Sequence, residues 1–176
     1  MTHSLLALGA TSFLADMHQA MAALLSPEVA ERSVLVDATS PRSGTPFLDL
    51  SDADFEQGFL TPALDLTDHL HSLPPERTSV LLLGSVDHLG EWHAVPAAAL
   101  AGFAIGLMRS LVLERMQAGL VVNIIAFPRD RTRLPDGWIG QAAQLGAALL
   151  SAGGINGHVL PFDGGANLRM TKARRR

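Results

Sequence analysis

The sequence predicts a three-layer α/β fold, in which helices cover both faces of a parallel sheet of about five strands. Two observations carry this prediction. Short apolar runs alternate along the chain with longer stretches of helical periodicity. The runs are also apolar at consecutive positions, as in "SVLV" and "LVVNII", which is typical of parallel strands buried on both faces. Such a sheet is Rossmann-like, so functional residues should follow the carboxyl ends of its strands.

The first half of the chain should contain three strands and two helices. Strands are predicted at residues 5–8, 33–36 and 78–83, and the first helix over about residues 13–25. Ser51 and Asp54 form a capping-box pattern for the second helix, which should continue toward Leu73 with Pro62 as a break or kink. The first strand should lie at an edge of the sheet.

The second half repeats the alternation. A long helix should begin near Pro96, reach about residue 117 and end at Gly119. Strands are predicted at residues 120–125 and 158–162, and Asp136 is expected to cap a helix over about residues 137–151. We assign residues 1–168 to a single domain and residues 169–176 to a basic C-terminal tail.

Composition excludes several classes of protein. The formal charge of −4 argues against a nucleic-acid binder, and the chain of 176 residues suits one domain. Cysteine is absent, which excludes disulfides and agrees with a cytoplasmic protein. No apolar run reaches transmembrane length without a polar break, and residues 1–25 lack the basic start of a signal peptide, so we expect no membrane association.

Three blocks follow one another late in the sequence: "GLMRSLVLE", "GLVVNIIAFP" and "INGHVLPFDGG". In order and spacing they resemble motifs of the short-chain dehydrogenase/reductase (SDR) family. "SVLVDATS" and "LLLGSVDHLG" resemble two earlier segments of that family, the second of which ends in its catalytic serine. The resemblance covers nearly the whole chain, most firmly residues 79–165. It implies the fold of an oxidoreductase that uses NAD(P).

The cofactor motif of the family is degenerate in this chain. Family members bind NAD(P) at T-G-x-x-x-G-x-G, whose glycines let the backbone approach the pyrophosphate. Of the comparable residues Gly9, Phe13 and Ala15, only the first is glycine, and Phe13 and Leu14 should fill the space of a phosphate. Asp37 adds a negative charge nearby, and two strands of the family's sheet are missing after the first helix. We therefore expect this chain to bind no cofactor.

The resemblance also implies a loss of catalytic groups. In the family a tyrosine transfers the carbinol proton, a lysine one helical turn later lowers its pKa, and a serine polarises the carbonyl. The tyrosine and lysine positions fall on Ala97 and Ala101, and the chain contains no tyrosine. Ser85 matches the serine and is the remnant of the catalytic set. We expect a truncated, catalytically degenerate SDR.

The resemblance implies that the helices used for subunit contacts in the family are retained in this chain. In the family, the counterparts of residues 51–73 and 95–117 pack against a neighbouring subunit, and the second is apolar here on more than one side. We therefore predict a non-catalytic pseudoenzyme subunit of a heteromeric NAD(P)-dependent dehydrogenase or ketoreductase. A full-length SDR partner would supply NAD(P). The predicted interface residues are Ala98, Gly102, Ile105, Met108 and Arg109.

Two other interpretations of the protein's function are compatible with the same sequence. One is a repurposed non-redox enzyme, a cyclase, dehydratase or hydrolase, that uses a strand-end cleft with the polar residues Ser85, Asp87, His88 and His93. Glu91 lies in the same loop, but no established metal-ligand spacing is present, so we expect no metal. Another is a homodimer that binds a ligand without chemistry. Three arginines of the loop after the fourth strand could hold an anion: Arg129, Arg131 and Arg133.

Overall fold

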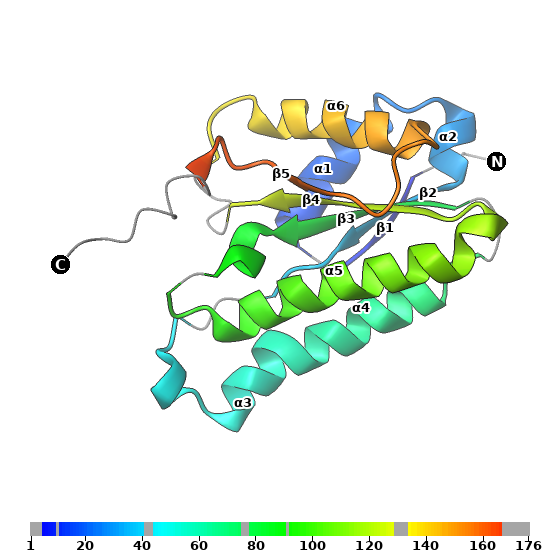
Figure 1. Cartoon of the computed structure of the whole chain (residues 1–176). Coiled ribbons are helices and arrows are strands. Elements are labelled where there is room, and N and C mark those ends of the chain that lie inside the picture. The colour runs from blue at the N-terminus through cyan, green and yellow to red at the C-terminus, as the bar shows by residue number, and fades with distance from the viewer. Residues whose placement is uncertain are drawn as a thin grey trace.

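A parallel sheet lies between two helical layers in the structure, a computed structural model (Figure 1). It describes residues 5–9, 11–40, 44–74, 78–90, 92–128 and 134–166. The described strands are all parallel and lie in the order β1-β2-β3-β4-β5. Their bounds are β1 Leu6–Leu8, β2 Ser33–Asp37, β3 Ser79–Ser85, β4 Val121–Phe127 and β5 Val159–Pro161. The predicted α/β class, the strand positions and the edge position of β1 are confirmed.

Helices follow each of the first four strands. Their bounds are α1 Ser12–Ala22, α2 Pro27–Glu31, α3 Asp52–Phe55, α4 Thr61–His71, α5 Val95–Arg115 and α6 Trp138–Ser151. The prediction of one helix over residues 13–25 was wrong at its end. The chain stops α1 at Ala22 and begins α2 afresh, with Ser26 as the N-cap and Pro27 in the first turn.

The second crossover contains the predicted capping box and the predicted break. Ser51 Oγ accepts a hydrogen bond from the Asp54 amide at 3.1 Å, and the Asp54 carboxylate accepts one from the Ser51 amide at 2.9 Å. A π-helical turn, Glu56–Leu60, then separates α3 from α4, which has Pro62 in its first turn. Gly58 in this turn touches α5 so closely that a Cβ would lie 2.6 Å from Cβ of Pro96.

One helix end was predicted correctly and one start wrongly. Gly119 ends the turn after α5 in a left-handed conformation with φ of 84°. Asp136 does not cap α6. The N-cap is Gly137, which has φ of 80° and makes no side-chain hydrogen bond. The left-handed backbone at Gly137 sets the direction of the helix, so Gly137, and not Asp136, is the residue that predicts the start of α6.

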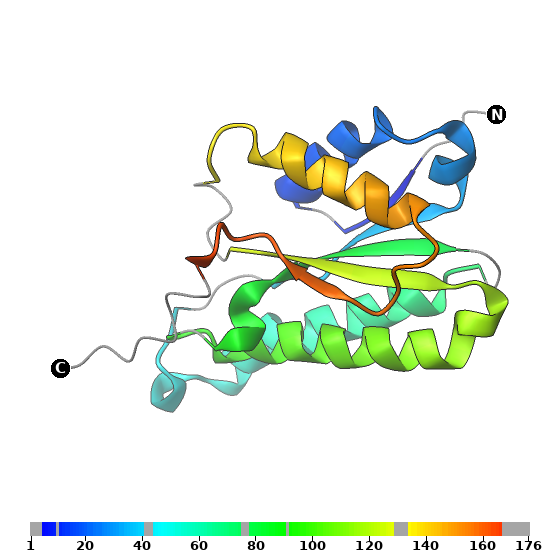
Figure 2. The ribbon, with the colours of Figure 1, turned by 45° about the horizontal axis from the view of Figure 1, so that its top comes forward.

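Each face of the sheet carries its own apolar core. On one face α1, α2 and α6 pack over β-strand residues that include Leu35, Leu81 and Ile125. On the other, α4 and α5 pack over the alternate residues of the same strands, among them Leu82 and Val122 (Figure 2). This is the three-layer arrangement that the consecutive apolar runs predict.

The crossovers between strands do not share one hand. All four steps from strand to strand run in the same direction across the sheet. Crossovers of a single hand would then place every helix on one face, yet α1 and α6 lie opposite α4 and α5 (Figures 1 and 2). Two crossovers therefore have the opposite hand to the other two. Since about 98% of such connections are right-handed, this is an unusual topology.

Candidate functional site

Thr11, Asp37 and Thr39 form a hydrogen-bonded cluster at the start of α1, where the resemblance places the dinucleotide site. Thr11 is the N-cap of this helix, and its Oγ1 accepts a hydrogen bond from the Leu14 amide at 3.2 Å. The Thr11 hydroxyl donates in turn to Oδ2 of Asp37, at the end of β2. The amide and hydroxyl of Thr39 donate to Oδ1 of Asp37 at 3.1 and 2.6 Å. The protein's own carboxylate thus stands beside the helix terminus where a bound phosphate would sit in a Rossmann-like site.

Little room remains between β1 and this cluster. Gly9 follows β1 with φ of 131°, and a Cβ built on it would lie 3.0 Å from Cβ of Asp37 and 3.0 Å from Cδ2 of Leu14. Leu14 is buried beneath the loop, as the sequence suggested for a residue filling this space, whereas Ala15 is exposed on α1. A phosphate in this place would need both side chains to move.

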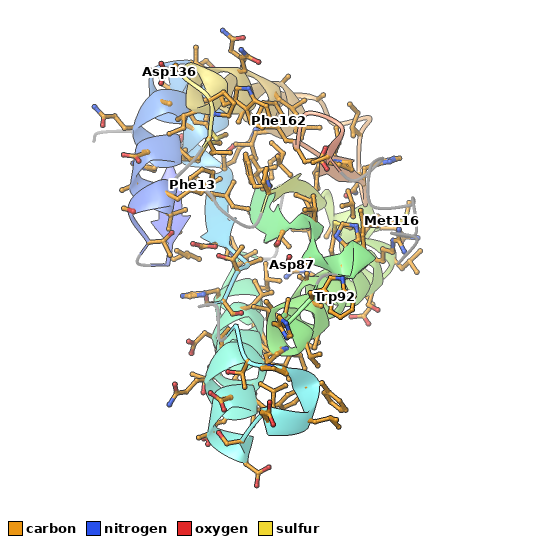
Figure 3. All side chains as sticks on the ribbon, turned by 90° about the vertical axis from the view of Figure 1, so that its left-hand side faces the viewer. Phe13, Asp87, Trp92, Met116, Asp136 and Phe162 are labelled. Atoms are coloured by element: carbon orange, nitrogen blue, oxygen red, sulfur yellow. The ribbon has the colours of Figure 1, made fainter. Side chains whose placement is uncertain are left out.

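Phe13 has a different role from the one expected of it. It does not lie in the space of a phosphate but packs in the core against Phe127 of β4, with ring centroids 4.8 Å apart. The contacts continue from Phe127 to Phe162 at 5.8 Å and from Phe162 to Trp138 at 5.2 Å. Figure 3, which looks onto the carboxyl edge of the sheet, shows Phe13 and Phe162 in the half of the molecule that holds α1 and α6. Aromatic side chains therefore fill this half of the edge.

The residues predicted at the positions of the family's catalytic set lie on β3 and α5. Ser85 ends β3, and its Oγ accepts a hydrogen bond from the Asp87 amide at 3.2 Å, so it caps the 3₁₀ turn Val86–Leu89. On α5, Ala97 is half-buried and Ala101 is buried against the sheet. Neither methyl group can transfer a proton.

The four polar residues of the alternative cleft differ in their surroundings. Asp87 is only 4% exposed, and Nδ1 of His88 lies 2.9 Å from the carbonyl oxygen of Ser85. His93 alone of the four lines the groove described below, and it has φ of 55°, the one positive φ among the described non-glycine residues. Glu91 lies outside the described residues, as do Arg129, Arg131, Arg133 and residues 169–176. No group of three candidate metal ligands occurs in the part of the chain that the structure describes.

A groove that the sequence did not reveal lies at the same edge, on the side of α5. We call it the Trp92 groove. It has a volume of about 690 Å³ and lies between the segment after β2 and the loop after β3. Its lining residues are Pro46, Phe47, Leu48, Asp49, Leu89, Gly90, Trp92, His93 and Val95. The available signal was the cluster of large apolar residues in two predicted loops, "PFLD" and "LGEWH".

The outer face of α4 and α5 also exposes apolar residues, and we call it the α4–α5 face. Leu60 ends the π-helical turn before α4, Leu64 lies on α4 and Leu113 lies on α5, and the last is 76% exposed. Gly102 and Gly106 lie on the exposed side of α5, where an added Cβ would meet nothing within 4 Å. Phe59 of the π-helical turn packs against Phe103 of α5, with ring centroids 6.2 Å apart.

The predicted interface residues fall mostly, but not all, on this outer side. Gly102 and Arg109 are exposed, and Ala98 and Ile105 are half-buried. Met108 was placed wrongly: it is 0% exposed and packs toward the sheet, in the core shared with α4. The stripe that faces away from the sheet continues to Leu113 in its place.

By length and composition the helical segment 95–118 could cross a membrane, and it is the one such helix among the described residues. This is weak evidence, because the core helix of a soluble protein passes the same test. Only 28% of its apolar window is buried. The segment is therefore apolar beyond what its own sheet requires.

No known protein family and no curated protein matches the sequence. Among solved structures, the chain resembles the NADH-dependent reductase A1-R′, which is responsible for alginate metabolism. The TM-score is 0.60 at 19% identity, over 76% of this chain and 64% of the reductase. For the same reductase complexed with NAD, the values are 0.61, 16%, 76% and 63%. The chain thus spans less than two thirds of that reductase, and the likeness supports a Rossmann-like α/β fold.

Proposed function

We propose that this chain is a non-catalytic subunit that stabilises or shapes a full-length, NAD(P)-dependent SDR partner. The observation that carries the proposal is the α4–α5 face. Leu60, Leu64 and Leu113 are large apolar residues exposed on two neighbouring helices, beside glycines that would let a second helix approach closely. A face of this kind is stabilised when a partner covers it.

The start of α1 supports the absence of a cofactor in this chain. Asp37 already accepts hydrogen bonds from Thr11 and Thr39, and bringing a phosphate beside this carboxylate would place two negative charges together. Gly9 lies close to both Asp37 and Leu14, so the loop has no free space under it. NAD(P) and the Ser–Tyr–Lys chemistry would come from the partner.

The topology supports the proposal that the chain is a shortened SDR. A doubly wound sheet has the order 3-2-1-4-5-6, and its first and fourth strands are neighbours. Removal of strands 2 and 3 would leave four strands in consecutive order with the first strand at the edge, like β1-β2-β3-β4 here, and β5 would be a further strand beyond them. The first helix would keep its place on the opposite face, which accounts for the unusual hand of the β1–α1–β2 crossover. It does not account for the β4–α6–β5 crossover.

Co-expression with an intact SDR homologue tests the proposal. The two chains should purify as one complex by size exclusion and native mass spectrometry, and the complex should reduce its substrate with NAD(P)H. Gly102→Trp should weaken the complex about 100-fold or more, because the indole would separate the paired helices. Gly140→Trp is the matched control. Gly140 is also an exposed helical glycine with open space around it, but it lies on α6 in the opposite layer.

Other results would contradict the proposal. Micromolar binding of NADPH to the isolated chain would show that the start of α1 opens for a cofactor. A stable homo-oligomer that ignores the homologue would favour the ligand-binding homodimer. Non-redox activity of the isolated chain that is lost in His88→Ala or His93→Ala would establish the repurposed enzyme.

A further inference from the structure

The Trp92 groove is apolar, exposed and bordered by acidic residues. Leu48 is 92% exposed, Trp92 is 76% exposed and Phe47 is 67% exposed. A pocket for a small ligand encloses most of that ligand. The lining residues here are too exposed for that, and such an open groove is suited to binding an extended polypeptide. Figure 3 shows Trp92 at the carboxyl edge, in the half of the molecule away from Phe13 and Phe162.

Among the described residues that line the groove, there is an acid and no lysine or arginine. Asp49 lines it, and the exposed acids Asp52 and Glu56 follow in the next helical turns. Asp54, between them, is held by Ser51, whose side chain and amide lower the pKa of this carboxyl. Residues 44–74 contain six acidic residues and no lysine or arginine. An occupant of this groove should therefore combine apolar side chains with positive charge.

We propose that the basic segment 167–176 of the same chain docks in the Trp92 groove. It has the composition that the groove calls for. Its sequence, "NLRMTKARRR", contains five of the thirteen lysines and arginines of the protein and no acid. Leu168 and Met170 supply large apolar side chains among these cations. This inference is independent of the proposed subunit function.

The distance to be spanned is within reach. The described chain ends at Ala166, after β5, at the same edge of the sheet as the groove. The groove lies beyond β3 and β2, two and three strands away, which is roughly 10–14 Å in the plane of the sheet. Ten residues extend to about 33 Å, so the segment can cross the edge without unfolding any described element.

Acrylamide quenching of tryptophan fluorescence tests the contact in the full-length chain. Trp138→Phe leaves Trp92 as the only tryptophan, and Phe preserves an aromatic ring beside Phe162. In this background the five cations are changed to glutamine: Arg169, Lys172, Arg174, Arg175 and Arg176. The quenching constant of Trp92 should rise about twofold or more, and a similar rise should follow in about 0.5 M NaCl for the unsubstituted segment. The double variant Arg32→Gln/Arg109→Gln removes exposed cations elsewhere and should leave quenching unchanged.

A second substitution pair tests the groove itself. Asp49→Asn with Asp52→Asn should raise the quenching constant in the same way as neutralising the segment. If the two sets of residues contact each other, the combined variant should show less than the sum of the separate effects. Equal quenching in all variants, or fully additive effects, would overturn the proposal. Protection of Trp92 that depends on protein concentration, together with a dimer on size exclusion, would overturn docking within one chain in favour of exchange between two copies.

Discussion

The two helical layers cover the same sheet, but they differ in how many large apolar residues they expose. In the layer of α1 and α6, the large apolar residues Met17, Met21 and Leu150 are buried against the sheet and against each other. In the layer of α4 and α5, a comparable core exists next to the sheet, yet Leu60, Leu64 and Leu113 remain exposed on the outside. In the first layer Leu24, in the turn after α1, is the exposed large apolar residue, whereas the second layer exposes several. The α4–α5 face is therefore the surface at which the proposed partner would bind.

The largest expected contrast compares leucine and methionine positions in the two layers. Met21→Ala should destabilise the isolated chain by about 2–5 kcal/mol, because it opens a cavity between α1 and α6. Leu64→Ala should change stability by less than about 0.5 kcal/mol in the isolated chain, because Leu64 is already exposed. Urea denaturation of both variants measures the contrast. Equal losses would mean that Leu64 is covered in the isolated protein, by a second copy for example.

Glycine-to-alanine substitutions, which add one methyl group, also compare the two helical layers. Gly146 on α6 meets Leu81 and Met21 so closely that a Cβ would lie 2.8 Å from Cδ2 of Leu81. Gly146→Ala should therefore destabilise by about 1 kcal/mol net, even though alanine favours helices. Gly102→Ala, with nothing within 4 Å, should stabilise the isolated chain by about 0.5–1 kcal/mol. Thermal melts should thus move in opposite directions, and a shared direction would contradict the assignment of one face as packed and the other as open.

The smallest expected effect concerns pH at the start of α3. Hydrogen bonds from the Ser51 hydroxyl and amide lower the pKa of Asp54 below its ordinary value of 3.8. A carboxyl whose folded pKa is lowered contributes stability at pH values above its unfolded pKa, and that contribution is lost as pH falls through the folded pKa. Asp54→Asn should lower Tm slightly at neutral pH and leave it unchanged once the wild-type carboxyl is protonated. Asp52→Asn, an exposed neighbour in the same turn, controls for the loss of one charge; an equal pH-dependent difference there would remove the role of the capping box.

The sequence predicts the core of this fold better than its edges. The described strands appear as mainly apolar runs in the sequence, because the three central strands β2, β3 and β4 are buried along nearly their whole length. The start of α6 was misjudged because a carboxylate at 136 suggested a side-chain cap, whereas the backbone turns at Gly137. Met108 was misplaced because α5 is apolar nearly all round, so periodicity does not show which side faces the sheet.

The candidate site also contains a part that the sequence addresses and a part that it does not reveal. The expected loss of catalytic groups is a prediction from single positions, Ala97 and Ala101, and stays a prediction. The Trp92 groove could not be located from single positions. It depends on two segments, around Leu48 and around Trp92, that follow different strands and meet only in the folded chain. A groove formed by loops has no regular spacing of apolar residues in the sequence, so hydrophobic periodicity cannot predict it.

The consecutive strand order also bears on how the chain folds. Every strand pairs with its neighbour in sequence, so each closure spans only one helical crossover. In a sheet of order 3-2-1-4-5-6, the first strand must wait for the fourth, and that late pairing raises the contact order. We expect this chain to assemble strand by strand as it leaves the ribosome, with short loops to close at each step. If the chain is the proposed subunit, its sheet would form before that of its partner. The α4–α5 face would then already be folded when the partner begins to bind.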